Sequence, residues 1–291
     1  MQKITPFLWF DTQAEDAAKL YTSLFPRSSI GNVRRYGDAG PGPKGQVMTL
    51  TFKLPGLEVM ALNGGPEFGF TPAGSLFVSC ATEKEINALW KELSAGGEVF
   101  MPLQKYPFSQ KFGWAGDRYG LSWQLNLGAK ETRVTPFLTF VGKLYGKTEE
   151  ALKYWTSLFK DSKVEHVERD GAAVKHALFT LGGQQFMAME SNLEHTWSFN
   201  EAFSLFVDCK TQDEVDELWE KLTDGGKESM CGWLQDRYGV SWQIVPSAMM
   251  RLLGDKNPAR SQAATLAMLK MRKLDIKALQ AAADGAAPPA A

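Results

Sequence analysis

The sequence predicts an α+β protein that consists of four βαβββ modules followed by C-terminal helices. Three observations support this prediction. The first is an internal repeat, in which "DRYGLSWQL" at 117–125 returns as "DRYGVSWQI" at 236–244. The second is the order of one buried strand, one amphipathic helix and three further strands within each half of a repeat. The third is a helical pattern after Val245 that has no counterpart in the repeat.

The repeat covers most of the chain and keeps the same order in both copies. "TPFLWF" at 5–10 returns as "TPFLTF" at 135–140, and "SLFVSC" at 75–80 returns as "SLFVDC" at 204–209. Self-similarity at a long period marks a structural unit that occurs more than once. We therefore expect a first domain at residues 1–128, a second at 132–246, a helical extension at 247–284 and a disordered tail at 285–291.

Each half repeat has the periodicity of a strand, a helix and three more strands. Ile4–Phe10 is a short apolar run typical of a buried strand, and residues 14–25 have apolar side chains at helical spacing until Pro26 ends the helix. Thr82 and Glu85 form a capping-box pattern at the start of the next helix. Gly- and Pro-rich turns then separate the remaining strands.

The repeated DRYG string predicts a tight turn. Asp117 would accept backbone hydrogen bonds where the turn begins, and Gly120 would take a positive φ where it ends. In the strand that follows, one face is apolar and would lie under a helix, whereas the polar face is typical of a cleft wall. The apolar face carries Leu121, Trp123 and Leu125, and the polar face carries Ser122, Gln124 and Asn126.

Two segments depart from the repeat. Before the Trp that precedes DRYG, the first copy has "EVFMPLQKYPFSQKFG" and the second only "KESMCG", which indicates that a hairpin or loop is shortened. In the tail, Asn257 and Pro258 are typical of an N-cap and a first helical position, and Asp275 would cap a last helix. The methionines of the tail are expected to pack against a domain.

Composition excludes several classes of function. The formal net charge is -1, which gives no overall field for nucleic acid or an anionic membrane surface. We find no signal-peptide pattern and no apolar run of the roughly 20 residues that span a bilayer. The three cysteines, Cys80, Cys209 and Cys231, form no even disulfide framework. We therefore expect a soluble cytoplasmic protein whose partner is a small molecule.

The openings "TPFLWF" and "TPFLTF", the helices "YTSLFP" and "WTSLF", and the "DRYG…WQ" endings resemble the vicinal oxygen chelate superfamily, which includes glyoxalases and bleomycin-resistance proteins. The resemblance covers residues 1–246 and is greatest to the PhnB-like branch, often labelled 3-demethylubiquinone 3-methyltransferase. It implies two glyoxalase-like cupped mixed sheets, each built from two modules that pair within a copy or between copies. It also implies that the two copies form an intrachain pseudo-dimer, and a homodimer remains open.

Metal-using relatives are implied to hold their ion with His and Glu at inward-facing strand positions. At these positions the chain has hydroxyl and carboxamide groups, which are weak donors for a divalent metal. A further position lies on the fourth strand, where Val59, Ala61 and Asn63 correspond to Phe186, Ala188 and Glu190. We therefore expect no metal and no cofactor. The carried-over positions are Thr5, Ser75 and Gln124 in the first copy and Thr135, Ser204 and Gln243 in the second.

The same six residues are candidates for binding a ligand, together with Trp114 and Trp233 just before the turns. For each of them the alternative is packing or hydrogen bonding within the fold. No catalytic residue is assigned. Candidates for acid or base chemistry are Glu190, which replaces Asn63 of the first copy, and the second-copy histidines His176 and His195.

Three functions stay open at this point. The preferred hypothesis is metal-independent binding, with or without transformation, of a small molecule in a sheet-lined cavity. The alternatives are a metal-dependent glyoxalase or dioxygenase, or the methyltransferase of the family label, although no Gly-rich loop between a parallel strand and a helix supports the latter. A partner-binding role of the C-terminal helices would require an exposed Met/Leu stripe.

Overall fold

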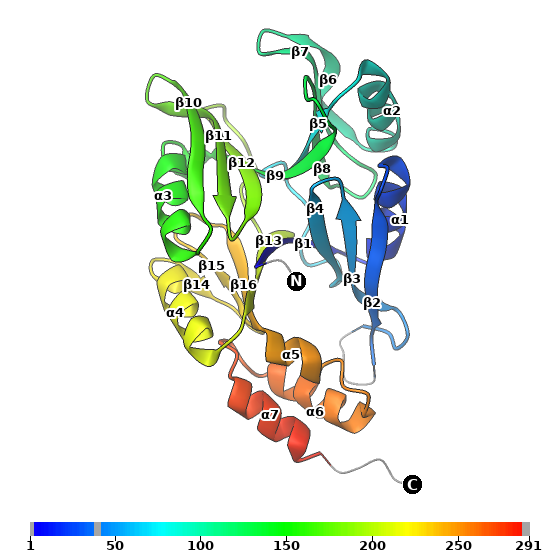
Figure 1. Ribbon diagram of the computed structural model, residues 1–291, viewed down its shortest axis with the longest axis vertical. Coiled ribbons are helices and arrows are strands. Elements are labelled where there is room, and N and C mark those ends of the chain that lie inside the picture. Colours follow the sequence, from blue (N-terminus) through cyan, green and yellow to red (C-terminus); the bar gives the residue numbers. More distant parts are fainter. Residues whose placement is uncertain (1–2, 38–41, 287–291) are drawn as a thin grey trace.

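The computed structural model describes residues 3–37 and 42–286 and has two eight-stranded mixed sheets (Figure 1). Sheet A has the strand order β14-β15-β16-β13-β1-β4-β3-β2, and sheet B has the order β10-β11-β12-β9-β5-β8-β7-β6. The strands of sheet A are β1 (Ile4–Phe10), β2 (Ser29–Arg35), β3 (Val47–Leu54), β4 (Leu57–Asn63), β13 (Phe203–Cys209), β14 (Lys227–Glu228), β15 (Trp233–Gln235) and β16 (Ser241–Pro246). Those of sheet B are β5 (Gly74–Cys80), β6 (Glu98–Tyr106), β7 (Ser109–Gly116), β8 (Ser122–Leu127), β9 (Arg133–Val141), β10 (Lys163–Asp170), β11 (Ala173–Leu181) and β12 (Gln184–Ser191).

One helix of each module covers the outer face of a sheet. Helices α1 and α4 pack on strands of sheet A, and α2 and α3 pack on strands of sheet B. The predicted order of one strand, one helix and three strands is confirmed in all four modules. The helices are α1 (Ala14–Leu24), α2 (Glu83–Leu93), α3 (Thr148–Leu158), α4 (Gln212–Thr223), α5 (Ser247–Leu252), α6 (Pro258–Met268) and α7 (Ile276–Asp284), with a short 3-10 helix at Gly142–Leu144.

The modules pair between the two copies of the repeat. Strand β1 of the first copy runs antiparallel to β13 of the second, with Thr5 opposite Phe206. In the same way β5 pairs with β9, with Phe77 opposite Thr135. Each sheet therefore takes one module from each copy, which decides between the two pairings that the sequence left open.

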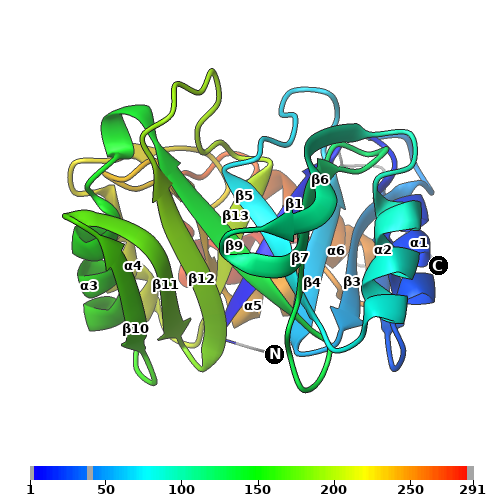
Figure 2. The same cartoon turned by 90° about the horizontal axis from the view of Figure 1, so that it is seen from above.

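The helix layers, in contrast, join the two modules of one copy. Helices α1 and α2 lie along one flank of the molecule and α3 and α4 along the other (Figure 2). The two modules of the first copy are joined through the Asp117 carboxylate. It accepts hydrogen bonds from the Tyr21 hydroxyl of α1 at 2.6 Å and from the Trp123 indole of β8 at 2.9 Å. Its other oxygen accepts the backbone N–H groups of Tyr119 and Leu121.

The second copy repeats this arrangement around Asp236. Its carboxylate accepts the indole N–H groups of Trp155 and Trp242, at 2.8 and 2.9 Å, and the backbone N–H groups of Tyr238 and Val240. A buried carboxylate is tolerated only when its hydrogen-bonding capacity is filled. The DRYG string and the Trp that follows it therefore recur because each pair of modules is held together through the aspartate.

The double glycines that follow α2 and α4 allow a close backbone crossing. A Cβ at Gly97 would overlap the carbonyl oxygen of Gly116, and one at Gly226 would overlap that of Gln235. The glycine before each of them has a positive φ and lies in the turn that follows the helix. The predicted caps are also present, since Thr82 and Glu85 form a capping box. Asn257 and Asp275 accept hydrogen bonds from the first turns of α6 and α7.

The C-terminal helices pack onto the inner face of sheet A (Figure 1). They form a second hydrophobic cluster with four side chains of the sheet: Phe7, Met60, Phe206 and Val245. From the helices, Met249, Leu252, Ala264, Leu279 and Ala283 are buried in this cluster. Residues 287–291 of the predicted disordered tail lie outside the described residues. Among the described helices, none combines the length and hydropathy that crossing a membrane requires.

Candidate binding cavity

A cavity of about 580 Å³ lies on the inner face of sheet B, opposite helices α2 and α3. We call it cavity B. It lies between a module of each copy and is bounded by both arms of the β6–β7 hairpin. The lining residues are Phe77, Met101, Phe108, Phe112, Trp114, Gln124, Asn126, Phe137, Glu168, Lys175, His176 and Met189.

Aromatic rings form much of the wall of cavity B. Phe77 and Phe137, which lie on adjacent strands, stack with ring centroids 5.6 Å apart and an angle of 19° between their planes. The His176 ring lies 6.1 Å from that of Phe137. Phe108 and Phe112 make an edge-to-face contact at the hairpin. Walls of this kind favour a planar apolar ligand, because stacking and edge contacts add to the burial of apolar area.

A few polar groups project into this apolar cavity. The Gln124 amide donates to the Ser75 hydroxyl at 2.9 Å, and Gln124 also lines the cavity. The Asn126 side chain accepts from Ser109 at 2.6 Å, which leaves its amide N–H groups for another acceptor. The Trp114 indole donates to Ser122 at 2.8 Å and presents its ring to the cavity. The fold thus fixes these side chains while one or more hydrogen-bonding groups of each amide stay available.

The charged groups of cavity B lie on strands β10 and β11. Glu168 pairs with Lys175 at 2.7 Å, so this ion pair adds no net charge to the wall. Glu168 lies opposite His176 across the two strands. Burial lowers the pKa of His176, although nearby Glu168 raises it in part. At neutral pH the imidazole is therefore uncharged and can donate or accept a hydrogen bond.

The corresponding face of sheet A is filled by the C-terminal extension. A cavity of about 240 Å³ remains between this sheet and helices α5 and α6, and we call it cavity A. Phe7, Phe206, Trp233 and Gln243 line it at the positions that Phe137, Phe77, Trp114 and Gln124 take in cavity B. Val245, which belongs to the hydrophobic cluster of the C-terminal helices, stands where Asn126 faces cavity B.

The shortened hairpin of the second copy explains how the extension can reach this face. In the first copy, β6 and β7 form a long hairpin, whereas β14 and β15 of the second copy have only two and three residues. The backbone N–H groups of Cys231 and Gly232 instead donate to the carbonyls of Met271 and Arg272, at 2.7 and 2.8 Å. The extension thus occupies the place of the missing hairpin.

The structure places the predicted ligand-binding residues on the inner faces of the two sheets. Gln124 and Trp114 line cavity B, and Gln243 and Trp233 line cavity A. Ser75 and Ser204 lie beneath the two glutamines as their hydrogen-bond acceptors. Thr5 and Thr135 are buried at the start of β1 and β9, and each lies next to an inward-facing Phe of the adjacent strand.

The predicted fourth-strand positions face the helices instead. Ala188 and Phe186 belong to the core under α3, as Ala61 and Val59 do under α1. Glu190 accepts backbone hydrogen bonds from Gly146 at 3.0 Å and Thr148 at 3.2 Å, at the N-terminus of α3. The inward-facing side chains of this strand include two methionines, since Met187 lies opposite Phe137 and Met189 lines cavity B.

Asn63 performs the same task in the first copy, because its side-chain oxygen accepts from Ala14 at the start of α1 at 2.8 Å. The asymmetry between Asn63 and Glu190 thus concerns a helix cap. His195 bonds to Ser191 at 2.8 Å, and its ring lies 4.3 Å from that of Trp197. Trp197 in turn contacts Trp114, which places His195 behind one wall of cavity B rather than in its lining.

Sequence reasoning did not single out several residues that line cavity B. Phe77 and Phe137 belong to short apolar runs that predict buried strands, and nothing in the local pattern sets Lys175 and Glu168 apart. One signal was available, because Glu168 aligns with Arg34 and His176 with Thr49 in the repeat. Charge changes at equivalent strand positions mark surfaces that have diverged, which fits two cavities of different character.

The side chains at the strand positions implied for a metal do not form a divalent-metal site in sheet B. Gln124, Ser75 and Thr135 offer carboxamide and hydroxyl oxygens, and the fourth strand contributes thioethers from Met187 and Met189. The imidazole of His176 and the carboxylate of Glu168 also line the cavity, but Glu168 is paired with Lys175. Zn²⁺ and Fe²⁺ sites require imidazole, carboxylate or thiolate ligands. Within residues 3–37 and 42–286, no group of three or more His, Cys, Asp or Glu side chains is arranged to hold an ion.

Two βαβββ modules that share a cupped mixed sheet define the vicinal oxygen chelate fold. In agreement, glyoxalase I from Zea mays is 11% identical and aligns with 82% of this chain and 92% of its own, with a TM-score of 0.53. The family model described as 3-demethylubiquinone-9 3-methyltransferase matches residues 2–126 and again 132–245. The chain therefore belongs to this PhnB-like family, with two tandem copies of its domain.

Two solved structures are similar to less than half of this chain. A PhnB protein from Bacillus cereus is 50% identical and covers 44% of this chain and 100% of its own, with a TM-score of 0.42. A protein from Staphylococcus aureus is 37% identical over 44% of this chain and 98% of its own, with a TM-score of 0.19. No curated protein matches the chain.

The family description names a methyl transfer, but the described residues do not fit the usual methyl-donor site. Such a site has a glycine-rich loop between a parallel strand and a helix. Here the glycine pairs 96–97 and 225–226 follow α2 and α4, and each allows a backbone crossing. The pair 64–65 packs against Trp9, and the pair 182–183 forms the turn between β11 and β12. We derive no methyl-transfer step from this arrangement.

Proposed function

We propose that cavity B binds a small, neutral, planar organic molecule and that it does so without a metal ion. The observation that carries this proposal is the lining of the cavity, which combines stacked aromatic rings with amide groups and holds its only two full charges in an ion pair. An apolar cavity with a few fixed polar groups is the usual form of a small-molecule site. Shape and hydrogen bonds would then select the ligand.

The residues of the site have distinct roles in this proposal. Phe77, Phe137 and Trp114 stack on the faces and edges of the ligand. Gln124 and Asn126 bind polar groups at its rim. Gln124 is oriented by Ser75, and the buried surroundings strengthen each hydrogen bond that the ligand completes. The unpaired state of all three cysteines agrees with a reducing, cytoplasmic location.

A second candidate function is metal-free proton transfer by His176. This residue lines the cavity, has a lowered pKa because of burial, and lies opposite Glu168. A neutral imidazole in contact with a bound ligand can act as a general base. A bound molecule with an acidic proton near His176 would be converted at a rate that the substitution His176→Gln abolishes while binding persists.

Calorimetric titration with 2-naphthol tests the binding proposal, because this probe is neutral, planar and has one hydroxyl group. Gln124→Leu should weaken binding about fivefold to tenfold, as expected for one lost hydrogen bond. The matched control Gln243→Leu removes the equivalent amide from cavity A and should leave the affinity unchanged. Saturated decahydronaphthol should bind more weakly than 2-naphthol because it cannot stack.

The metal-free part of the proposal requires a separate measurement. Protein dialysed against a chelator should bind 2-naphthol with the same affinity as untreated protein, and elemental analysis should find no stoichiometric Zn, Ni, Mn or Fe. Binding that appears only after one of these metals is added would contradict the proposal. Equal effects of Gln124→Leu and Gln243→Leu would show that the probe does not bind in cavity B.

A further inference from the structure

Cavity A has a chemical character of its own, although the C-terminal helices reduce its volume. Its lining is almost entirely apolar, with aromatic rings from sheet A on one side and methionine and leucine side chains from α5 and α6 on the other. Methionines adapt readily to ligands of different shape. The apolar lining includes Trp9, Met48, Met60, Leu62, Met249, Leu253 and Met268.

One cationic side chain, that of Arg34, lies in this apolar wall. Arg34, on β2, lines cavity A at the position that Glu168 takes in cavity B. Its guanidinium donates one hydrogen bond, to the Met250 carbonyl at 2.8 Å, and in the described part of the chain it pairs with no carboxylate. Burial lowers the pKa of Arg34. A guanidinium has five N–H donors, and only one of those of Arg34 is used by the Met250 carbonyl. The others can donate to a further, charged acceptor.

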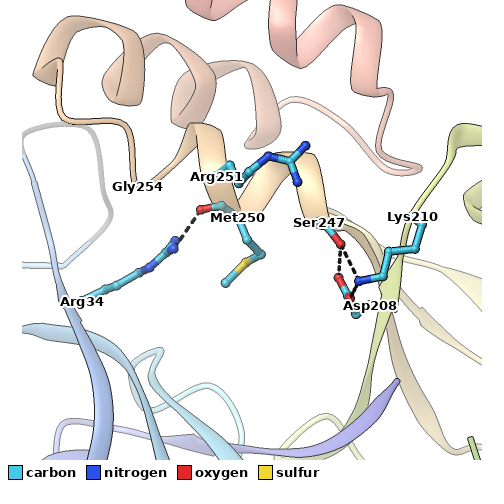
Figure 3. Close-up of a pocket in the computed structure, with 7 residues that line it drawn as sticks. All are labelled: Arg34, Asp208, Lys210, Ser247, Met250, Arg251 and Gly254. Atoms are coloured by element: carbon cyan, nitrogen blue, oxygen red, sulfur yellow. Dashed lines mark hydrogen bonds and ion pairs between the residues drawn. The ribbon is translucent and has the colours of Figure 1, made fainter. Parts of the chain in front are cut away.

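A second, open cleft of about 440 Å³ adjoins the same residue, and Arg34 and Met250 line both spaces (Figure 3). Arg251 also lines the cleft, and among the described residues it has no acidic partner. On the opposite side Lys210 pairs with the buried Asp208, which also accepts from Ser247. The two arginines thus leave the cleft with an excess of positive charge where it meets the apolar cavity.

We propose that cavity A is a second binding site, for an amphipathic monocarboxylate such as a medium-chain fatty acid. The carboxylate binds the Arg34 guanidinium, which offers the two parallel donors that a carboxylate accepts. The alkyl chain of the fatty acid lies between Met60 of the sheet and Met268 of α6. Arg251 attracts the anion at the mouth of the cleft. The site uses none of the residues proposed to bind the ligand of cavity B.

The charge reversal between the two cavities supports this choice of ligand. Cavity B has Glu168, Lys175 and His176 where cavity A has Arg34, Met48 and Thr49. The first set is balanced by its ion pair, whereas the second has one unbalanced positive charge. An anionic head and an apolar tail match the second set, and a neutral planar molecule matches the first.

The test uses the full chain with methyl-labelled methionine, titrated with octanoate or with octanol and followed by NMR. Octanoate should shift the methyl resonances of Met60 and Met268 and leave those of Met101 and Met189, which line cavity B, in place. Octanol has the same chain without the charge and should bind about tenfold more weakly, the effect expected for a charged hydrogen bond.

Arginine variants then identify the side chain that binds the carboxylate of octanoate. Arg34→Gln should weaken octanoate binding about tenfold and leave octanol unchanged. Arg35→Gln, the matched control, removes a neighbouring arginine that approaches Glu15 of α1 and should have no effect. Because Arg34 also holds α5, Arg251→Gln provides a second variant. Arg251 is exposed, and its substitution should lower the octanoate affinity about twofold without affecting the fold.

Three results would overturn the proposal. The first is that octanoate shifts only Met101 and Met189, which would place the fatty acid in cavity B. The second is equal affinity for octanoate and octanol, or an equal loss in Arg34→Gln and Arg35→Gln, since either would remove the role of the guanidinium. The third is that octanoate shifts no methionine resonance. Gln124→Leu should leave octanoate binding unchanged, so failure of this site is distinguishable from failure of cavity B.

Discussion

Replacing Glu190 separates its role as a helix cap from a role as an acid or base. The side chain is 7% exposed and accepts one hydrogen bond from the backbone of Gly146 and one from that of Thr148. Glu190→Ala removes both acceptors. We expect the free energy of unfolding to fall, and ligand binding in cavity B to stay unchanged.

The magnitude follows from the surroundings of the two donors. Thr148 is fully buried, so its N–H would lose its partner without access to water, which costs about 1–3 kcal/mol. Gly146 is exposed, and water can replace the lost acceptor there. Loss of a negative charge at the N-terminus of α3 adds about 0.3–1 kcal/mol. The total for Glu190→Ala is therefore about 1–4 kcal/mol.

Glu190→Gln provides a matched comparison. The glutamine can keep its amide oxygen on Thr148 and turn its amide nitrogen towards the solvated Gly146, so the loss should stay near or below about 1 kcal/mol. Glu194→Ala, which removes an exposed carboxylate on the following loop, should change stability by less than about 0.5 kcal/mol.

Guanidinium denaturation at neutral pH, followed by tryptophan fluorescence, measures these differences as shifts of the unfolding midpoint. A stability loss for Glu190→Gln as large as that for Glu190→Ala would contradict the cap geometry. Unchanged stability in both variants combined with lost binding or turnover would exclude the cap role, because Glu190 would then act on the ligand.

Three further predictions concern the fold. Burial raises the pKa of Asp236 to about 6 from an ordinary value of 3.8, so the folded chain binds this proton more tightly than the unfolded chain. The contribution of this group to stability should therefore increase as the pH falls from about 6 to about 4. The gain is about 3 kcal/mol at 1.36 kcal/mol per pKa unit. Asp236→Asn should remove this pH dependence, as measured by urea titrations across that window. Gly97→Ala and Gly226→Ala should each cost more than about 3 kcal/mol in thermal unfolding because the new Cβ would overlap backbone oxygen, whereas Gly69→Ala, with open space around it, should be close to neutral. Val245→Asn should cost about 2–3 kcal/mol by placing an amide in the apolar contact with the C-terminal helices, and a neutral result would show that they do not pack on sheet A.

Much of the fold could be predicted because its local signals agree with one another. The capping box at Thr82, the N-cap at Asn257 and the alternation after Asp117 each depend on interactions within a few residues, and all three are present. The pairing of β1 with β13 could not be predicted. Both pairings bury the same strand faces, and the two copies are too similar in sequence to favour either one.

The inner face of the fourth strand was misassigned for a physical reason. Both faces of β4 are buried, one under α1 and the other against the C-terminal helices. A strand that is buried on both sides has no alternation of polar and apolar residues, so Met60 and Ala61 look alike in the sequence. The pattern therefore leaves open whether the polar ends Asn63 and Glu190 face a cavity or solvent, and in the structure both serve as helix caps.

The position of the C-terminal helices also could not be predicted from the sequence. Their apolar stripes predict packing, but the surface that receives them depends on the shortened hairpin before Trp233 and on contacts far apart in the chain. Val245 in place of Asn126 was the one visible trace of this packing, because it removes a polar group from the inner face of sheet A.

Metal-free binding in cavity B is tested most directly by a structure of the full chain crystallised with 2-naphthol after treatment with a chelator. We expect the probe to lie in cavity B between Phe77, Phe137 and Trp114, with its hydroxyl group bonded to Gln124 or Asn126 and no ion within the site. A probe bound instead through a metal at Ser75, Gln124 or Thr135, or an empty cavity B at saturating probe, would contradict it.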